Sequence, residues 1–259
     1  MKLRMVPARQ GAVWVKMGVR TFFRQPLALT GLFFLFMAAM SVLSLVPVLG
    51  SVIALALLPA ATLGLMAATQ EASKGKFPMP TVLVSAFRAG RAQLRGMLVL
   101  GGLYALGFLL VMGLSALVDG GQFARLYLVG GELSAELLMQ SDFEAAALVA
   151  MALYLPLSLL FWHAPALVHW HGISPVKSLF FSLVACARNF WAFTVFGLVW
   201  MAAFLGVGLV VAVVSALLGS PQLVGAILLP AGMAMAAMFF TSLYFTFDDS
   251  FEVSTGDPA

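Results

Sequence analysis

Residues 27–46 read LALTGLFFLFMAAMSVLSLV, a run of twenty positions without a charged side chain. The hydrocarbon core of a bilayer is about 30 Å thick, and about 20 apolar residues are needed to cross it as an α-helix. Pro47 follows this run directly, and residues 48–69, VLGSVIALALLPAATLGLMAAT, form a second uncharged run. The sequence therefore predicts two membrane spans joined by a very tight turn.

Four further uncharged stretches of sufficient length follow, at residues 97–118, 145–168, 191–218 and 223–247. The chain of 259 residues is 63% hydrophobic and only 9% charged, whereas soluble domains are about 25% charged. This composition excludes a soluble enzyme, a disordered chain and a nucleic-acid-binding protein. We therefore expect an all-α fold, a polytopic transmembrane six-helix bundle that forms a single integral membrane domain over residues 1–259.

The segments between the spans differ in charge, and this difference predicts the orientation of the chain. Thirteen of the 14 Lys and Arg residues lie in segments 1–26, 70–96 and 169–190, and Arg125 alone lies on the other side. Because cytoplasmic loops of membrane proteins are enriched in Lys and Arg, we expect both termini to be cytoplasmic. Residues 119–144 then form an acidic outer loop, and residues 248–259 form an acidic, frayed cytoplasmic tail.

Each pair of spans is preceded by a cytoplasmic segment that begins at a proline and ends at an arginine, at residues 7–24, 80–95 and 175–188. We expect three similar hairpins, each preceded by an amphipathic helix that lies in the membrane interface. Cations recur on one face of each segment, and apolar residues such as Val13 and Trp14 take the other face. The residues predicted to bind lipid headgroups are Arg9, Lys16, Arg20, Arg24, Arg88, Arg91, Arg95, Lys177 and Arg188.

The three histidines of the chain, His163, His169 and His171, lie within nine residues at the end of the fourth predicted span. One interpretation is a metal or haem site. His163 and His169 are six residues apart, about 240° around a straight helix, so they face one ion only if Pro165 distorts that helix. The spacing also lacks the i, i+4 pattern of a helical metal site. We therefore favour an interfacial belt of histidine and tryptophan without a metal or cofactor.

No Asp, Glu, Lys or Arg lies inside a predicted span, whereas ion-coupled pumps and proton relays usually place ionisable groups there. The sequence contains no metalloprotease, serine-hydrolase or phosphate-binding motif. Its one cysteine, Cys186, excludes an intrachain disulfide and is interpreted as a small apolar filler. We therefore expect a protein without enzymatic activity.

The stretch from His163 to His171, continued by GISPVKSLFFS and by Arg188-Asn189-Phe190-Trp191, resembles an uncharacterised six-span inner-membrane protein family of Gram-negative bacteria. The opening VPARQG, followed by Trp14, fits the same family. The likeness covers nearly the whole chain and involves no catalytic motif. The chain is more loosely similar to the membrane domain fused to some glycerophosphodiester phosphodiesterases, whose catalytic domain it lacks. The resemblance implies a multi-pass protein of the bacterial inner membrane.

These features favour a non-enzymatic integral inner-membrane protein that organises lipids or partner proteins. Its expected partners are membrane lipids, anionic ones above all, with a membrane protein as the alternative partner and no nucleic acid. A second hypothesis is a passive or partner-driven transporter of a small apolar or lipidic solute, which would pass between spans that contain Pro59, Pro156 and Pro230. The third hypothesis is the metal- or haem-binding subunit.

Overall fold

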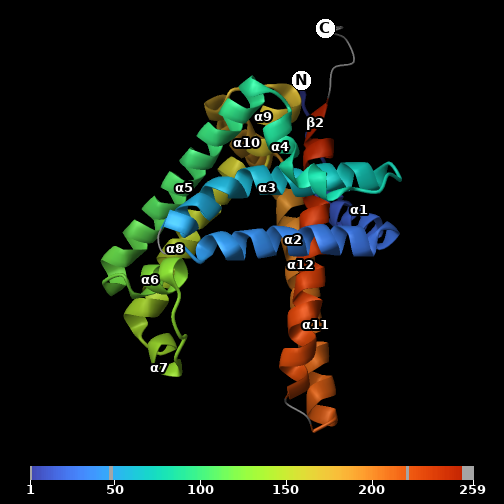
Figure 1. The fold of residues 1–259 in the computed structure, drawn as a ribbon. Coiled ribbons are helices and arrows are strands. Elements are labelled where there is room, and N and C mark those ends of the chain that lie inside the picture. The colour runs from blue at the N-terminus through green and yellow to red at the C-terminus, as the bar shows by residue number, and fades with distance from the viewer. Residues whose placement is uncertain (1, 47–48, 220–221, 253–259) are drawn as a thin grey trace, which may run out of the picture. The chain divides into compact units, whose positions relative to one another are not determined.

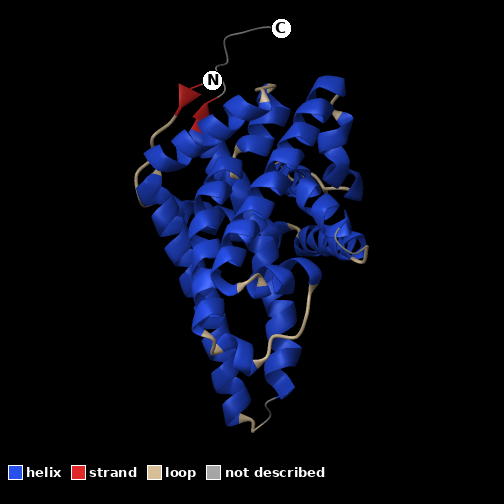
Figure 2. Cartoon of the chain, turned by 90° about the vertical axis from the view of Figure 1, so that its left-hand side faces the viewer, coloured by secondary structure: helices blue, strands red, loops and turns tan. Residues whose placement is uncertain are grey.

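The structure is a computed structural model that describes residues 2–46, 49–219 and 222–252. These residues are helical almost throughout, and the strands among them are a single pair of two residues each (Figure 2). The chain divides into two compact units, which we describe separately. The terminal unit comprises Met1–Leu35, Gly64–Leu83 and Val184–Ala259, and the central unit comprises Phe36–Leu63 and Val84–Leu183.

Six long apolar segments are each long enough to cross a membrane, which confirms the all-α, polytopic fold class (Figure 1). They are α2 (Pro26–Ser44), α3 (Leu49–Ser73), α5 (Arg91–Asp119), α8 with α9 (Ser141–Phe161 and Ala164–His171), α11 (Phe190–Leu217) and α12 (Gln222–Ser250). The shorter helices are α1 (Gln10–Arg24), η1 (Pro80–Val84), α4 (Ser85–Arg88), α6 (Gln122–Val129), α7 (Ala135–Leu138) and α10 (Pro175–Arg188).

Several of these helices extend beyond the uncharged runs. The helix α5 has 29 residues and includes Arg91 and Arg95, which the sequence places before the third span. A helix of this length measures about 43 Å, which matches a bilayer together with its headgroup regions rather than the hydrocarbon core alone. The uncharged runs therefore have the length that the hydrocarbon core requires, and the helices continue beyond them over charged residues.

The expectation of a frayed tail from residue 248 onwards is wrong for its first five residues. Asp248 and Asp249 belong to α12, and β2 (Phe251–Glu252) pairs antiparallel with β1 (Lys2–Leu3). The backbone N–H of Arg4 also donates to the carbonyl of Ser250 at 3.0 Å. Pairing with the start of the chain thus holds this segment. Residues 253–259 and the predicted turn at Pro47 lie outside the described residues, as do residues 220–221 between the last two predicted spans.

The fourth span is broken between Phe161 and Ala164. Pro165 explains the break, because proline has no backbone N–H and its ring collides with the carbonyl four residues earlier, which here belongs to Phe161. Pro59, Pro156 and Pro230 lie inside α3, α8 and α12, which continue through them.

The expectation of an interfacial helix over residues 80–95 is also wrong. The chain instead forms η1 and α4, ends this segment at Gly90, and begins the membrane-spanning helix α5 at Arg91. Gly90 has a backbone φ of 113°, which residues with a side chain rarely adopt and which lies outside the helical range. The helix is therefore interrupted at this residue. Arg91 and Arg95 therefore occupy the first two turns of a span.

In the terminal unit, α1 packs against α11 and α12, and these two helices pack against each other. Glycines allow the close approach of α1. A Cβ atom at Gly11 would collide with the backbone carbonyl of Ala192 in α11, and one at Gly18 would lie 2.5 Å from Cβ of Ser242 in α12. Ser242 also accepts a hydrogen bond from the indole of Trp200 at 3.2 Å, which joins α11 to α12.

In the central unit, α5 packs against α8, and α6 packs against both. A Cβ atom at Gly107 would lie 2.6 Å from the side chain of Leu157, so a glycine lets α8 approach closely. The hydroxyl groups of Tyr104 and Tyr154 are hydrogen-bonded at 3.2 Å across the same contact. Small residues and aromatic pairs, rather than charges, hold these helices together, as is usual between membrane helices.

Candidate functional site

The cationic face of α1 is built by the spacing of residues along the helix. One side is buried and consists of Gly11, Trp14, Val15, Gly18, Thr21 and Phe22. The other side carries Lys16, Arg20 and Arg24, and Arg9 precedes the first turn; all four side chains are exposed. Trp14 lies opposite the cations, as its spacing predicts, and the buried face to which it belongs packs against α11 and α12.

A carboxylate on α12 holds the buried face of α1. Oδ2 of Asp249 accepts a hydrogen bond from the indole of Trp14 at 2.7 Å and one from the amide of Gln10 at 2.5 Å. Trp14 is fully buried, and its ring contacts those of Phe193 and Phe196 on α11. These two hydrogen bonds and the packing of the Trp14 ring together fix which side of α1 faces α11 and α12.

A second polar contact fixes the chain before α1. The buried side chain of Asn189, which directly precedes α11, accepts a hydrogen bond from the N–H of Val6 at 2.9 Å. Its amide group donates to the carbonyl of Arg4 at 3.0 Å. The amide side chain of Asn189 thus bonds to the carbonyl of Arg4 and to the N–H of Val6. These bonds fix the position of the segment that leads into α1.

Large apolar side chains lie exposed beside these cations. Phe23 is next to Arg24, and Leu27, in the first turn of α2, is 88% exposed. On α10, Phe180 is 61% exposed and lies three residues from the exposed Lys177. Exposed apolar and cationic residues on the same helices fit the boundary between acyl chains and headgroups.

Arg88, Arg91 and Arg95 lie at the junction of α4 and α5, and all three are exposed. Arg91 and Arg95 occupy the N-terminal turns of α5, where the helix dipole places positive charge and where no acidic residue is present in the first turn. The positive end of the helix dipole repels the arginine side chains, and a bound anion offsets this repulsion. This junction is therefore a suitable site for a phosphate group.

None of the nine predicted headgroup-binding cations takes part in an ion pair within residues 2–46, 49–219 and 222–252; the pair found there joins Arg4 to Glu252 at 3.3 Å. All nine, including Arg188 at the end of α10, are exposed. The structure divides them between the two units, with the α1 cations and Arg188 in the terminal unit and the others in the central unit.

The histidines are arranged differently from a metal site. His163 is fully buried at the break between α8 and α9, whereas His169 and His171 are partly exposed near the end of α9. Across the described part of the chain, no group of three or more His, Cys, Asp or Glu residues is placed to hold a metal ion. The geometry therefore gives no support to the metal hypothesis.

Sequence reasoning missed the role of Ser182 at this break. Its hydroxyl accepts a hydrogen bond from the backbone N–H of His163 at 2.9 Å and donates one to the carbonyl of Leu159 at 2.8 Å. In an unbroken helix that N–H and that carbonyl would bond to each other. A side chain of α10 thus inserts into the opened turn and satisfies both groups.

Asp249 and Asn189 were missed as well, because their partners lie at the other end of the chain.

Cys186 is buried on the inner side of α10, and burial raises the pKa of its thiol to about 12. This position agrees with its interpretation as a small apolar filler.

The chain is similar over nearly its whole length to a protein of Burkholderia thailandensis whose description is "probable inner membrane protein". The two are 41% identical over 256 residues, which cover 98% of this chain and 95% of that protein. No family model matches the chain. No solved structure matches it either.

Proposed function

The chain belongs to the same inner-membrane protein family as the Burkholderia protein, and from this premise we propose that it binds anionic phospholipids through its basic helices. It is an integral, multi-pass protein of the inner membrane. In the proposed role it has no enzymatic activity of its own. It gathers anionic headgroups around the exposed cations of α1, α10 and the junction of α4 with α5.

The proposal includes an orientation with both termini in the cytoplasm. The distribution of Lys and Arg supports it, because thirteen of the 14 lie in segments that would then be cytoplasmic. The pairing of Lys2–Leu3 with Phe251–Glu252 supports termini on a common side of the membrane. The negative surface of the cytoplasmic leaflet then lies next to the basic helices.

The observation that carries the proposal is the fixed outward face of α1. The contacts of Asp249 with Trp14 and Gln10 leave Lys16, Arg20 and Arg24 on the side away from α11 and α12. A flexible basic loop would suffice for insertion alone. A buried hydrogen-bonded anchor that orients the cations is an additional feature, and a headgroup-binding role explains it.

The energy available to such a surface is substantial. One cation near an anionic membrane surface contributes on the order of 1 kcal/mol. Neutralising three neighbouring cations should therefore lower the affinity for anionic lipid by up to roughly 100-fold at low ionic strength, and by less when salt screens the charges.

The test uses the full-length protein reconstituted in vesicles of phosphatidylethanolamine and phosphatidylglycerol. The lipids that remain bound after gentle detergent extraction are separated and quantified. We expect the triple variant with Arg88, Arg91 and Arg95 changed to Gln to retain at least about five-fold less phosphatidylglycerol relative to phosphatidylethanolamine. The matched control changes the same residues to Lys, which preserves the charge, and should retain the ratio of the unmodified protein.

A second control separates lipid binding from insertion. Met5 is exposed, so a Met5→Cys change in a Cys186→Ala background reports the side on which the N-terminus lies through a membrane-impermeant maleimide. The triple Gln variant should keep the labelling pattern of its parent. An unchanged lipid ratio in a correctly oriented triple variant would overturn the proposal. Co-purification of a stoichiometric second protein in place of lipid would also overturn it, in favour of a protein partner.

A further inference from the structure

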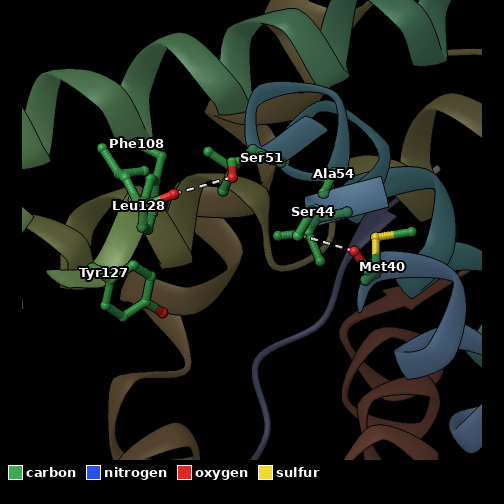
Figure 3. Close-up of a pocket in the computed structure, with 9 residues that line it drawn as sticks. Met40, Ser44, Ser51, Ala54, Phe108, Tyr127 and Leu128 are labelled. Carbon is green, nitrogen blue, oxygen red and sulfur yellow. Dashed lines mark hydrogen bonds between the residues drawn. The ribbon is translucent and has the colours of Figure 1, made fainter. Parts of the chain in front are cut away.

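A pocket of about 170 Å³ lies within the central unit (Figure 3). Its wall is largely carbon and includes Met40 from α2, Ala54 and Leu58 from α3, Phe108 from α5 and Leu128 from α6. An enclosed apolar cavity of similar volume, about 150 Å³, is large enough to bind benzene.

The two serine hydroxyls of the wall donate their hydrogen atoms to backbone carbonyls. Ser44 donates its hydroxyl hydrogen to the carbonyl of Met40 at 2.9 Å, and Ser51 donates to the carbonyl of Leu128 at 3.1 Å (Figure 3). The bond from Ser51 also holds α6 against the start of α3. Because these two hydroxyls already have acceptors and the exposed Tyr127 lies where its hydroxyl can meet polar groups outside, a ligand inside the pocket is expected to be hydrocarbon.

The pocket lies at the end of the spans that is remote from the arginines of α5. Phe108 is seventeen residues after Arg91, about 25 Å along the helix, and α6 follows the C-terminal end of α5. Ser44 is the last residue of α2, and Ser51 lies in the first turn of α3. Tyr127 lines the pocket and is 64% exposed, as is typical of tyrosines where acyl chains meet headgroups.

A cation lies beside the pocket on α6. Arg125 is exposed and lies three residues before the pocket-lining Leu128, so the two side chains are neighbours on one face of the helix. Arg125 is also the one cation in the sequence between residues 96 and 176. The described residues give Arg125 no ion pair. The carboxylate of Asp119, at the end of α5, instead accepts hydrogen bonds from the N–H groups of Gly121 and Phe123, at 2.8 and 2.6 Å.

We infer that this pocket binds the upper part of one acyl chain of a phospholipid, whose phosphate lies at Arg125. The pocket supplies a largely apolar surface, Tyr127 contributes an exposed ring to its wall, and Arg125 provides the positive charge. The inference goes beyond the proposed function, because this lipid belongs to the leaflet opposite to that of Arg91. If the pocket binds no lipid, the proposed role of the basic helices is unaffected. If the basic helices bind no lipid, the inference about the pocket is likewise unaffected.

The experiment uses phosphatidylglycerol with a photoreactive diazirine in the upper part of one acyl chain. The full-length protein is labelled in phosphatidylethanolamine vesicles, and modified peptides are identified by mass spectrometry. We expect adducts on the segments around Met40 and Leu128, in addition to general labelling of the exposed residues of α11. Excess unlabelled phosphatidylglycerol should suppress the adducts at the pocket and leave those on α11, because a specific site saturates.

The test variant is Ala54→Phe, which fills the pocket, and the matched control is Ile53→Phe, which introduces the same ring at the neighbouring exposed position outside the pocket. Because the bilayer is as apolar as the pocket, the gain from binding comes from packing and is modest. We expect Ala54→Phe to lower pocket labelling, relative to α11, about three- to ten-fold. Ile53→Phe should leave it within about two-fold.

A third arm distinguishes the phosphate from the acyl chain. Diacylglycerol with the same photoreactive chain should label the pocket about five-fold more weakly than phosphatidylglycerol, and Arg125→Gln should remove this difference. Equal labelling by both lipids would overturn the phosphate contact. Labelling of the pocket that does not saturate in the unmodified protein would overturn the pocket as a lipid site, and so would an unchanged ratio of pocket to α11 labelling in a folded Ala54→Phe variant. The competition arm decides the question even if Ala54→Phe fails to fold.

Discussion

The indole N–H of Trp14 donates a hydrogen bond of 2.7 Å to the carboxylate of Asp249, a residue 235 positions later in the chain. Through this bond the helix that carries Lys16, Arg20 and Arg24 is attached to the last span. The fully buried Trp14 ring defines the inner side of α1, so the cations are directed outward. The contact therefore connects the packing of the terminal unit to the proposed lipid-binding surface.

We expect Trp14→Phe to lower the free energy of unfolding by about 1.5–3 kcal/mol, because it removes a hydrogen bond to a charged acceptor. The matched control is Trp191→Phe, which makes the same change at an exposed position on α11. The thermal midpoint of the purified protein in one detergent measures the effect. Equal midpoints for the two variants would contradict the role assigned to the Trp14 bond.

The close approach of α1 to α11 leads to a prediction about glycine. Gly11→Ala places a Cβ atom against the carbonyl of Ala192, and forcing the helices apart should destabilise the protein by about 1–3 kcal/mol. Gly31→Ala, in α2, is the control, because a Cβ atom there has nothing within 4 Å. The control should be neutral or slightly stabilising, since alanine favours helices. A Gly11→Ala protein with the stability of the control would show that α1 does not pack in this way.

Much of the architecture could be predicted from the sequence, because the bilayer imposes a simple requirement on it. Uncharged runs such as residues 27–46 have the length of a span, and the structure places a helical segment of that length at each of the six runs, the fourth being broken between α8 and α9. The exposure of Lys16, Arg20 and Arg24 also follows from their helical spacing. Both features depend on local sequence alone.

The contacts that orient α1 could not be predicted in this way. Asp249 belongs to an acidic run near the end of the chain, and nothing in the neighbouring sequence distinguishes it from Asp248 as the acceptor for Trp14 and Gln10. Asn189 likewise binds backbone groups of residues 4 and 6, whose distance in sequence hides the contact. The break at Gly90 was missed because the periodic spacing of arginines continues across it.

The bridge formed by Ser182 gives a third prediction. Ser182→Ala removes the group that satisfies the N–H of His163 and the carbonyl of Leu159, and the loss should destabilise the protein by about 1–3 kcal/mol. Ser158→Ala is a suitable comparison, because Ser158 bonds only to the carbonyl of Leu155 in its own helix among the bonds described. Hydrogen exchange at residues 159–163 should accelerate in Ser182→Ala. Unchanged exchange and stability would contradict the bridge.

The buried Cys186 thiol gives a prediction about pH. Because burial raises its pKa to about 12, the thiol stays protonated in the folded protein at pH 8 and should react slowly with maleimides. The unfolded thiol ionises near its ordinary pKa of about 8.5–9, so this group does not alter stability below that pH. Between pH 9 and 12 its contribution should lower stability as the pH rises.

The rate of maleimide labelling at pH 8, with and without denaturant, checks this prediction. The Met5→Cys protein in a Cys186→Ala background, whose thiol would be at an exposed position, should react rapidly under both conditions. Equally rapid labelling of native Cys186 would show that α10 does not bury this side chain.

The central claim is that the basic helices hold anionic phospholipid. Native mass spectrometry of the protein, extracted gently with the lipids of its own membrane, tests it most directly. We predict adducts with the masses of anionic phospholipids, which are depleted when Arg88, Arg91 and Arg95 are changed to Gln and are kept when they are changed to Lys. A bare chain, or the same adducts on all three proteins, would contradict the claim.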